Sequence, residues 1–370
     1  MQKIDLNNKT ILVTGGAGFI GSNLIKRLFK DVTGSTIINI DNLNDYYDVR
    51  LKEYRLKELK DESEKLKVNY HFVKGDIADK QTIDRIFEEY KPHVVVNLAA
   101  QAGVRYSITN PDAYIMSNMI GFYNILEACR HSLTPGPSPE GKGGYRGVEH
   151  LVYASSSSVY GGNKKVPFST DDRVDNPVSL YAATKKSNEL FAHCYSKLYD
   201  IPTTGLRFFT VYGPAGRPDM AYFGFTNKLL KGETIQIFNY GNCRRDFTYV
   251  DDIVEGVWRV MQRPPAATPS PSGEGLGEAP YAVYNIGGGQ PENLLDFVNI
   301  LQEELVRAGV LPQDFDFEAH KKLVPMQPGD VPTTYADATA LERDFGFTPK
   351  ITLREGLRHF AEWYATYYCK

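Results

Sequence analysis

Two polar side chains at helical spacing, Tyr181 and Lys185, form the most informative chemical motif of this chain. Residues four apart lie on one face of an α-helix, so the phenol and the ammonium would be neighbours. A free tyrosine titrates near pH ~10 and is a weak base at neutral pH, but a nearby ammonium favours the phenolate. We therefore expect Tyr181 to act as a base that Lys185 tunes, although surface helices also contain this spacing by chance.

Four consecutive serines, Ser155–Ser158, stand upstream of that motif. A hydroxyl from this run could share the proton of a bound substrate with the tyrosine. Tyrosine, lysine and serine together can remove a proton from a sugar alcohol while a hydride leaves its carbon. Because the hydride needs an acceptor, the value of the motif depends on whether the chain also has a dinucleotide site.

The N-terminal segment has the pattern of such a site. Residues 10–14 are typical of a buried strand, Gly15, Gly18 and Gly21 follow in a loop, and residues 22–30 have helical spacing. The glycines would let the backbone approach a pyrophosphate, whose charge would face the helix N-terminus. A strand before and a helix after the glycines favour this interpretation over an ordinary tight turn.

A carboxylate follows the next apolar run. Asp41 ends residues 36–40 and stands twenty positions after Gly21. An acid at this distance binds a ribose diol and would repel a 2′-phosphate, so the sequence predicts NAD rather than NADP. The alternative is a solvated aspartate at the end of a turn.

Strands then alternate with helices along the chain, which predicts a doubly wound parallel Rossmann sheet. The expected strands are residues 70–77, 93–100 and 150–154, and the expected helices are residues 81–90 and 118–129. Ligands bind beyond the carboxyl ends of such strands, where every motif named so far falls. The further predicted cofactor-binding residues are Phe19, Ile20, Asn42, Asp76, Ile77, Leu98, Ala99, Ala100 and Asn118.

Composition excludes several classes of protein. The chain is 42% hydrophobic and 24% charged with a net charge of −3, which is ordinary for a globular protein and gives no reason to expect nucleic acid. No apolar run approaches the ~20 residues of a membrane helix, and the N-terminus lacks a signal-peptide core. The four cysteines have no metal-ligand or redox spacing, which predicts free thiols in a reducing cytoplasm and no metal.

Two Pro/Gly-rich segments interrupt the pattern, near residues 133–147 and 264–280, and share a short repeat. They are interpreted as tolerated loop insertions rather than as partner-docking elements. At 370 residues the chain is long enough for two domains. We expect an NAD-binding domain over residues 1–206 and a smaller α/β substrate-binding domain over residues 207–370. Within the second, residues 237–258 and 282–298 are expected to return to the Rossmann side.

The chain resembles the extended short-chain dehydrogenase/reductase family of nucleotide-sugar enzymes nearly end to end. Within that group it is most similar to the UDP-glucuronate 4-epimerases. Besides the glycine and Tyr/Lys motifs, the segments that carry the resemblance are residues 41–48, 98–105, 177–186, 208–214, 216–220 and 326–332. The resemblance implies NAD-dependent 4-epimerisation of UDP-glucuronate to UDP-galacturonate through a transient 4-keto sugar, with tightly bound NAD and a role in polysaccharide biosynthesis.

The resemblance also implies residue roles. Tyr181 would take the 4-hydroxyl proton with help from Ser156, while Ser157 could share that role. Lys185 would also hydrogen-bond the nicotinamide ribose. The implied substrate-binding residues are Ser156, Ser157, Ser158, Thr210, Arg217 for a carboxylate, Arg245 for the pyrophosphate, Gln327, and Asp330 for the uridine ribose. Galactose-type epimerases tend to carry an arginine where this chain has Gln327, which argues against a plain UDP-galactose enzyme.

Rival activities share the fold and the first half-reaction. UDP-glucuronate decarboxylases and 4,6-dehydratases usually carry a carboxylate where this chain has Ser157 and Ser158. The absence of a carboxylate at these positions disfavours decarboxylation and dehydration. It leaves 4-epimerisation of another UDP-hexose as an alternative. A non-catalytic NAD-binding sensor would predict a damaged Tyr/Lys/Ser set, yet all three residues are present. Relatives pair the helices near residues 117–130 and 181–199 into a four-helix bundle, so a homodimer is expected.

Overall fold

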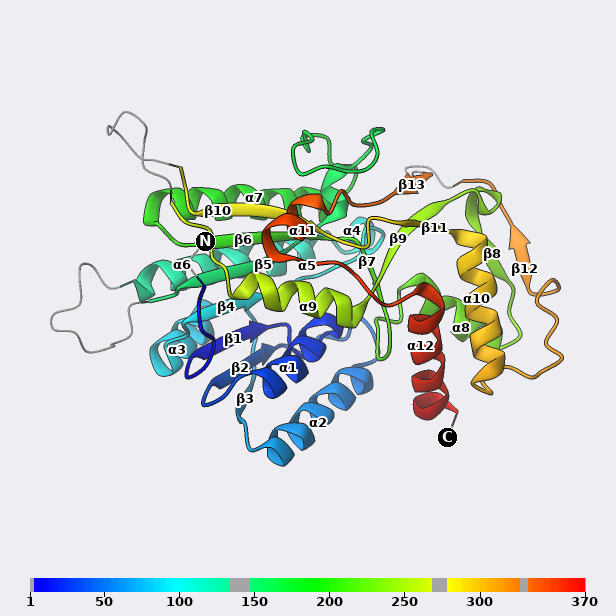
Figure 1. The fold of residues 1–370 in the computed structure, drawn as a ribbon, viewed down its shortest axis with the longest axis horizontal. Helices are drawn as coiled ribbons and strands as arrows, with labels where there is room; N and C mark the ends of the chain where they lie inside the picture. The colour runs from blue at the N-terminus through cyan, green and yellow to red at the C-terminus, as the bar shows by residue number, and fades with distance from the viewer. Residues whose placement is uncertain (1–2, 134–146, 268–277, 327–331, 370) are drawn as a thin grey trace. The chain divides into compact units, whose positions relative to one another are not determined.

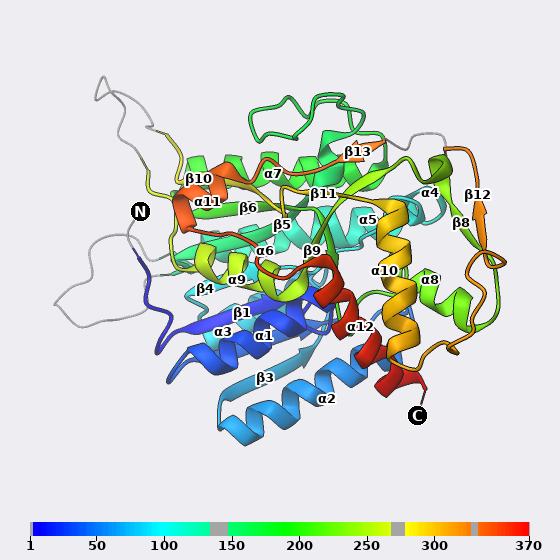
Figure 2. The ribbon, with the colours of Figure 1, turned by 45° about the vertical axis from the view of Figure 1, so that its right-hand side comes forward.

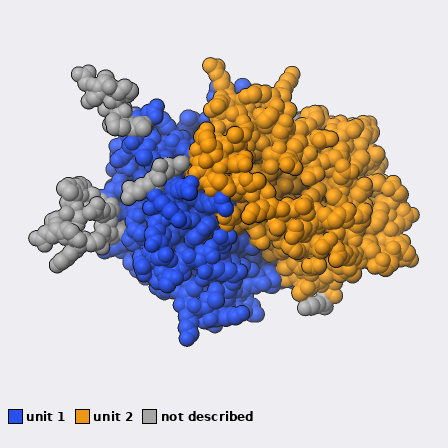
Figure 3. All heavy atoms as spheres, in the orientation of Figure 1, with its two compact units in different colours: residues 1–161, 174–207, 256–284 blue, residues 162–173, 208–255, 285–370 orange. Residues whose placement is uncertain are grey.

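The computed structural model describes residues 3–133, 147–267, 278–326 and 332–369, and the chain divides into two compact units (Figure 3). Unit 1 comprises Met1–Gly161, Val174–Arg207 and Gly256–Tyr284, and unit 2 comprises Gly162–Arg173, Phe208–Glu255 and Asn285–Lys370. The domain boundaries expected from the sequence stay a prediction. Most of the two Pro/Gly-rich segments, residues 134–146 and 268–277, lies outside the described residues.

A seven-stranded sheet forms the centre of unit 1 (Figure 1). In spatial order its strands are β10 (Tyr281–Ile286), β6 (Thr203–Phe208), β5 (His150–Ser156), β4 (Val94–Asn97), β1 (Thr10–Thr14), β2 (Thr36–Asp41) and β3 (Asn69–Lys74). The neighbours from β5 to β3 pair in parallel. Strands β1 and β4 are mostly apolar, and all their residues except the half-buried Thr10 are buried, as expected for a parallel sheet that helices cover on both sides.

Helices connect these strands and cover the sheet (Figure 2). They are α1 (Phe19–Asp31), α2 (Val49–Leu66), α3 (Lys80–Tyr90), α4 (Tyr106–Thr109), α5 (Pro111–Tyr114), the π-helix η1 (Ile115–Gly121), α6 (Phe122–Ser132), the 3₁₀-helix η2 (Ser157–Tyr160), α7 (Leu180–Tyr199) and α9 (Val250–Met261). One core cluster joins apolar residues of α3, α6 and α7 to the strands. The predicted doubly wound sheet is confirmed.

Several element boundaries differ from the prediction. Strand β3 ends at Lys74 and β4 ends at Asn97, so Asp76 and the residues after Asn97 belong to loops. The helix expected from Asn118 begins instead as a π-helix at Ile115. These shifts place the predicted contact residues in loops just beyond the strand ends, where the backbone is not committed to the sheet.

Unit 2 contains a smaller set of strands and helices. Its four-stranded sheet has the order β11 (Pro291–Asn293), β9 (Arg244–Tyr249), β13 (Thr333–Thr334), with β7 (Thr210–Tyr212) also paired to β9, and a two-stranded sheet joins β12 (Lys321–Leu323) to β8 (Ile235–Ile237). Its helices are α8 (Ala221–Leu230), η3 (Phe238–Gly241), α10 (Leu294–Arg307), α11 (Thr339–Phe345) and α12 (Leu353–Tyr368). Aromatic rings fill its interior, for example Phe247 stacked on Phe297 with centroids 4.2 Å apart.

No helix in the described ranges of the chain is long and apolar enough to cross a membrane.

Candidate active site

Helix α7 presents the Tyr/Lys pair. The helix begins after Ser179, whose hydroxyl accepts a hydrogen bond from the Ala182 amide at 3.1 Å and so caps the first turn. Tyr181 and Lys185 follow one turn apart, as predicted. The ring of Tyr181 meets that of the buried Tyr114 edge to face, with centroids 5.9 Å apart. This contact restricts where the phenol of Tyr181 can point.

The Lys185 ammonium is buried. It donates a hydrogen bond to the Ala154 carbonyl oxygen at 2.8 Å, two residues before the end of strand β5. Burial lowers the pKa of Lys185 from its ordinary value to about 8, because desolvation disfavours the charged form. At pH 7 the ammonium form therefore still dominates by about tenfold, and the group would lose its proton only slightly above neutrality.

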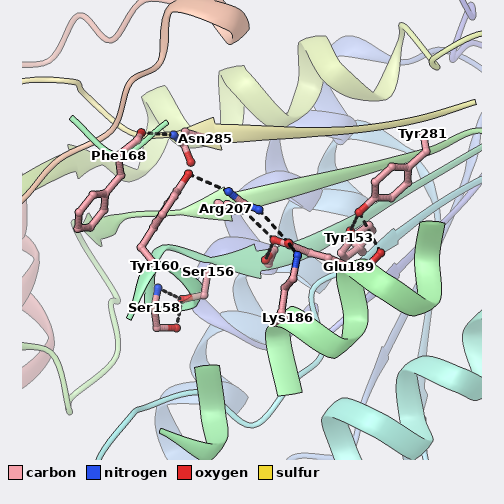
Figure 4. A network of polar contacts seen from close by, with 11 residues as sticks. Tyr153, Ser156, Ser158, Tyr160, Phe168, Lys186, Glu189, Arg207, Tyr281 and Asn285 are labelled. Carbon is pink, nitrogen blue, oxygen red and sulfur yellow. Dashed lines mark hydrogen bonds and ion pairs between the residues drawn. The ribbon is translucent and has the colours of Figure 1, made fainter. Parts of the chain in front are cut away.

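The serines leave strand β5 in a tight turn. Ser156 is its last residue, and Ser157 and Ser158 begin the 3₁₀-helix η2. The Ser156 hydroxyl oxygen accepts hydrogen bonds from the Ser158 amide at 3.2 Å and from the Ser158 hydroxyl at 2.7 Å (Figure 4). Since both of these contacts use lone pairs of Ser156, its own O–H proton can still be donated. Ser157 is half-buried beside it.

The glycine loop leaves no room for side chains. Gly15 has a φ of 73°, in the left-handed region that glycine tolerates best, and a Cβ there would lie 2.7 Å from the Ala99 nitrogen. A Cβ on Gly18 or Gly21 would approach the Gly15 carbonyl oxygen to 2.9 Å and 2.4 Å respectively. Helix α1 begins directly after Gly18, at Phe19. The bare backbone and the helix N-terminus fit a dinucleotide pyrophosphate.

Asp41 lies beside this loop. Its carboxylate accepts hydrogen bonds from the Ala17 amide at 3.1 Å and from the Leu43 amide at 2.9 Å. These bonds orient a buried acid at the end of β2, as a ribose-binding carboxylate requires. The guanidinium of Arg55 donates to the Ala17 carbonyl at 2.9 Å and is itself fully buried.

A second carboxylate, that of Asp76, lies just beyond the end of strand β3 and is held by hydrogen bonds. Asn42 donates through its side-chain amide to the Asp76 carboxylate at 2.8 Å, and the Ala78 amide donates to the other Asp76 oxygen at 2.8 Å. Ile77 is buried, and its carbonyl accepts a hydrogen bond from Asn124 at 2.9 Å. Asp41, Asn42 and Asp76 therefore lie at adjacent strand ends, as predicted.

Asn118 holds the loop beyond strand β4. Its side-chain oxygen accepts from the Gln101 amide at 2.8 Å, and its side-chain nitrogen donates to the Gln101 carbonyl at 3.0 Å. Nearer the strand, the Ala99 amide donates to the Thr14 hydroxyl at 3.1 Å. Asn118 therefore fixes the backbone that follows Leu98–Ala100. Its predicted contact with the cofactor stays a prediction.

In unit 2, the predicted substrate residues lie on separate elements. Thr210 begins β7 and is half-buried. Arg217 forms a two-pronged ion pair with the Asp219 carboxylate, at 3.0 and 2.6 Å. On β9, Arg245 donates to the carbonyl of Pro332 at 2.9 Å. Gln327 and Asp330 lie outside the described residues.

Sequence reasoning missed one pair of charged residues. Glu189 and Arg207 form a buried ion pair directly behind the serines, with N–O distances of 2.8 and 2.9 Å. Glu189 stands four residues after Lys185, so it shares the helix face of Tyr181 and Lys185, and that spacing was the available signal. Nothing local to Arg207 indicates its partner.

Comparisons with known proteins agree with this geometry. Residues 11–287 match the family described as "NAD dependent epimerase/dehydratase family". Protein CapI of Staphylococcus aureus is 49% identical over 364 residues, covering 97% of this chain and 99% of that protein. A probable UDP-glucuronate 4-epimerase of Rhizobium meliloti is 42% identical, covering 95% and 96%. The UDP-glucuronic acid 4-epimerase of Bacillus cereus, solved with UDP-glucuronic acid and NAD, has a TM-score of 0.77 at 29% identity, covering 97% and 100%.

Proposed function

The chain belongs to the NAD dependent epimerase/dehydratase family, and from that premise we propose that it interconverts UDP-glucuronate and UDP-galacturonate at C4. The observation that carries the proposal is the combination of the Tyr181/Lys185 pair on α7 with hydroxyls, rather than a carboxylate, at positions 156–158. The names of the Rhizobium meliloti and Bacillus cereus relatives support the uronate substrate.

The proposed mechanism begins with proton removal. The Lys185 ammonium stabilises the phenolate of Tyr181, which takes the proton of the sugar 4-hydroxyl. The Ser156 hydroxyl, held by two hydrogen bonds from Ser158, donates its proton toward the same sugar oxygen. Tyr181 returns the proton after the 4-keto sugar has turned over, so the chain undergoes no net change.

The residues of unit 1 fit NAD, which would supply the acceptor and donor of the C4 hydride. Gly15, Gly18 and Gly21 would bind its pyrophosphate through backbone amides, and Asp41 would bind its adenosine ribose. Lys185 has donors beyond the one used by Ala154 and would hydrogen-bond the nicotinamide ribose.

Substrate recognition is proposed for unit 2. Arg217 already holds a carboxylate, that of Asp219, in the fork geometry that a hexuronate carboxylate would require. Arg245 would bind the pyrophosphate of the nucleotide sugar. For Thr210, Gln327 and Asp330 we propose the sugar and the uridine ribose as partners, on the basis of the family resemblance.

Decarboxylation and dehydration are the nearest alternatives, and both need an acid/base carboxylate near the serines. Glu189 contacts this segment through Ser155, but the Arg207 guanidinium engages both of its oxygens. A carboxylate held in that way is a poor proton carrier. This engagement favours epimerisation.

We also propose a homodimer in the cytoplasm. Apolar side chains exposed on η1, α6 and α7 are Ile115, Met116, Ile120, Tyr123, Leu190 and Leu198. Helices α6, α7 and η1 contact one another, and we propose that a second copy covers these exposed apolar side chains. The four cysteines are unpaired, which favours a reducing compartment.

The uronate assignment is tested by assaying UDP-glucuronate and UDP-glucose in parallel and comparing kcat/KM. We expect the hexuronate to be preferred by about 10²-fold or more, because its carboxylate can replace that of Asp219 on the Arg217 fork and a neutral hydroxymethyl group cannot. Equal kcat/KM values for the two sugars would overturn the uronate assignment and leave a general UDP-hexose 4-epimerase.

A further inference from the structure

A buried ion pair contacts residues at both ends of the serine segment. Glu189 on α7 and Arg207 on β6 meet through two hydrogen bonds, and their side chains are only 3% and 4% exposed. Burial opposes ionisation of Glu189, but hydrogen bonds from Arg207 and Ser155 hold the pKa of its carboxyl below the ordinary value. The pair is therefore charged throughout the neutral range and rigid in its geometry.

Each partner of this ion pair also holds one end of the serine segment. Glu189 accepts a hydrogen bond from the Ser155 hydroxyl at 2.7 Å. Arg207 donates to the Tyr160 hydroxyl at 2.9 Å and lies over the ring of Tyr160, 4.9 Å from its centroid (Figure 4). Ser156, Ser157 and Ser158 lie between these two attachment points. The three hydroxyls are thus presented by a turn that is fixed at both ends.

We propose that the Glu189–Arg207 pair positions the serine turn so that the Ser157 hydroxyl, whose proton neither Ser156 nor Ser158 uses, holds the substrate carboxylate and prevents its loss from the 4-keto sugar. The inference rests on the proposed function. Glu189 and Arg207 are positioning residues in this account, because they act through Ser155 and Tyr160 and need not touch the substrate.

The chemistry explains why position matters. A 4-keto uronate is a β-keto acid. When its C5–C6 bond breaks, the electron pair passes to C5 and the C4 oxygen as an enolate, CO₂ leaves, and C5 is then protonated to give a 4-keto pentose. The breaking bond must stand out of the plane of the ketone, so a hydroxyl that keeps the carboxylate near that plane slows the loss. When a group that orients a substrate is displaced by about 1 Å, the rate that it controls can change by about a hundredfold.

Two single-hydroxyl deletions test the proposal without unpairing the buried charges. Ser155→Ala removes the hydrogen bond to Glu189, and Tyr160→Phe removes the hydrogen bond from Arg207 while keeping the ring that the guanidinium lies over. Tyr281→Phe is the matched control, because the Tyr281 hydroxyl donates to the Glu189 backbone carbonyl at 3.0 Å and contacts Tyr153 rather than the serine turn. The readouts are the ratio of UDP-pentose species to UDP-galacturonate, by proton NMR, and the melting temperature.

We expect Ser155→Ala and Tyr160→Phe each to raise that ratio by about five- to tenfold, roughly the effect of one lost hydrogen bond. Tyr281→Phe should lower the melting temperature about as much as Ser155→Ala and Tyr160→Phe do. It should leave the product ratio at the wild-type value. An unchanged ratio in both test variants, or an equal rise in the control, would overturn the positioning role.

The wild-type protein separates failure of this inference from failure of the proposed function. If wild type converts UDP-glucuronate to UDP-galacturonate while the variants keep its product ratio, only the positioning role is wrong. If wild type forms no UDP-galacturonate, the proposed function is wrong and the inference falls with it.

Discussion

At the scale of single residues, the buried lysine controls when the base is active. Lys185 has a pKa of about 8 because burial disfavours its charge, and it must be an ammonium to stabilise the phenolate of Tyr181. The Lys185 pKa is depressed, so the proton is present below about pH 8 and is lost as the pH rises through that value. Activity should therefore decline on the alkaline side of pH 8.

Lys185→Met tests this role. We expect turnover at pH 7 to fall by about 10²- to 10⁴-fold, the usual contribution of an acid–base group. The residual activity should rise with pH toward the ordinary tyrosine pKa of ~10, since Tyr181 has lost its ammonium neighbour. Lys197→Met, three turns along the same helix, is the control. A variant whose pH profile matches wild type would contradict the assignment.

The buried imidazole of His150 makes the stability of the protein depend on pH. His150 on β5 contacts the Met261 carbonyl at 3.1 Å and the Thr204 hydroxyl at 2.9 Å. A carbonyl can only accept, so Nδ1 carries the proton and Nε2 accepts from Thr204. Burial lowers the pKa of His150 to about 4, which keeps the folded-state ring neutral at mildly acidic pH.

The sign of the pH effect follows from linkage. Below its ordinary pKa of ~6.5 the unfolded-state histidine binds a proton that the folded state does not take up until about pH 4, so stability is lost over that interval. Between pH 7 and pH 5 this costs about 2 kcal/mol of unfolding free energy. The urea concentration at the unfolding midpoint should fall more between pH 7 and pH 5 for wild type than for His150→Gln. Parallel losses would refute the account.

At the scale of elements, the glycine loop depends on the absence of side chains. A Cβ at position 21 would lie 2.4 Å from the Gly15 carbonyl oxygen, so Gly21→Ala must push the loop open. We expect the purified variant to lose most of its bound NAD, which extraction and absorbance measure. Gly224→Ala in helix α8 is the control, since its nearest contact is 3.9 Å away. Full cofactor occupancy in Gly21→Ala would contradict the assignment of the pyrophosphate site.

Local patterns in the sequence were sufficient for the elements that carry contiguous motifs. The strand–glycine–helix segment and the Tyr181/Lys185 spacing could be predicted because each depends on neighbours within one or two elements. The Glu189–Arg207 pair could not, since packing of β6 against α7 creates it. The π-helical turn at Asn118 also escaped prediction, because apolar periodicity does not distinguish a π-turn from an α-turn.

At the scale of the whole molecule, the apolar surface on η1, α6 and α7 predicts self-association. Leu190 is 58% exposed and Leu198 is 57% exposed, although both are large and apolar. Light scattering should give a mass twice that of the 41.6 kDa chain. Leu190→Glu should shift the mass toward the monomer, whereas Leu230→Glu on α8 should not. A wild-type protein that is monomeric at micromolar concentration would refute the dimer.

The most direct test of the account is to incubate the protein as purified with UDP-glucuronate, adding no NAD, and to follow the sugar protons by NMR. We predict that UDP-galacturonate accumulates to equilibrium without net formation of NADH, because bound NAD is restored in each turnover. UDP-pentose as the main product would contradict the claim that the serine turn protects the carboxylate. A protein that holds NAD but leaves UDP-glucuronate unchanged would contradict the claim that it is an epimerase acting on this sugar.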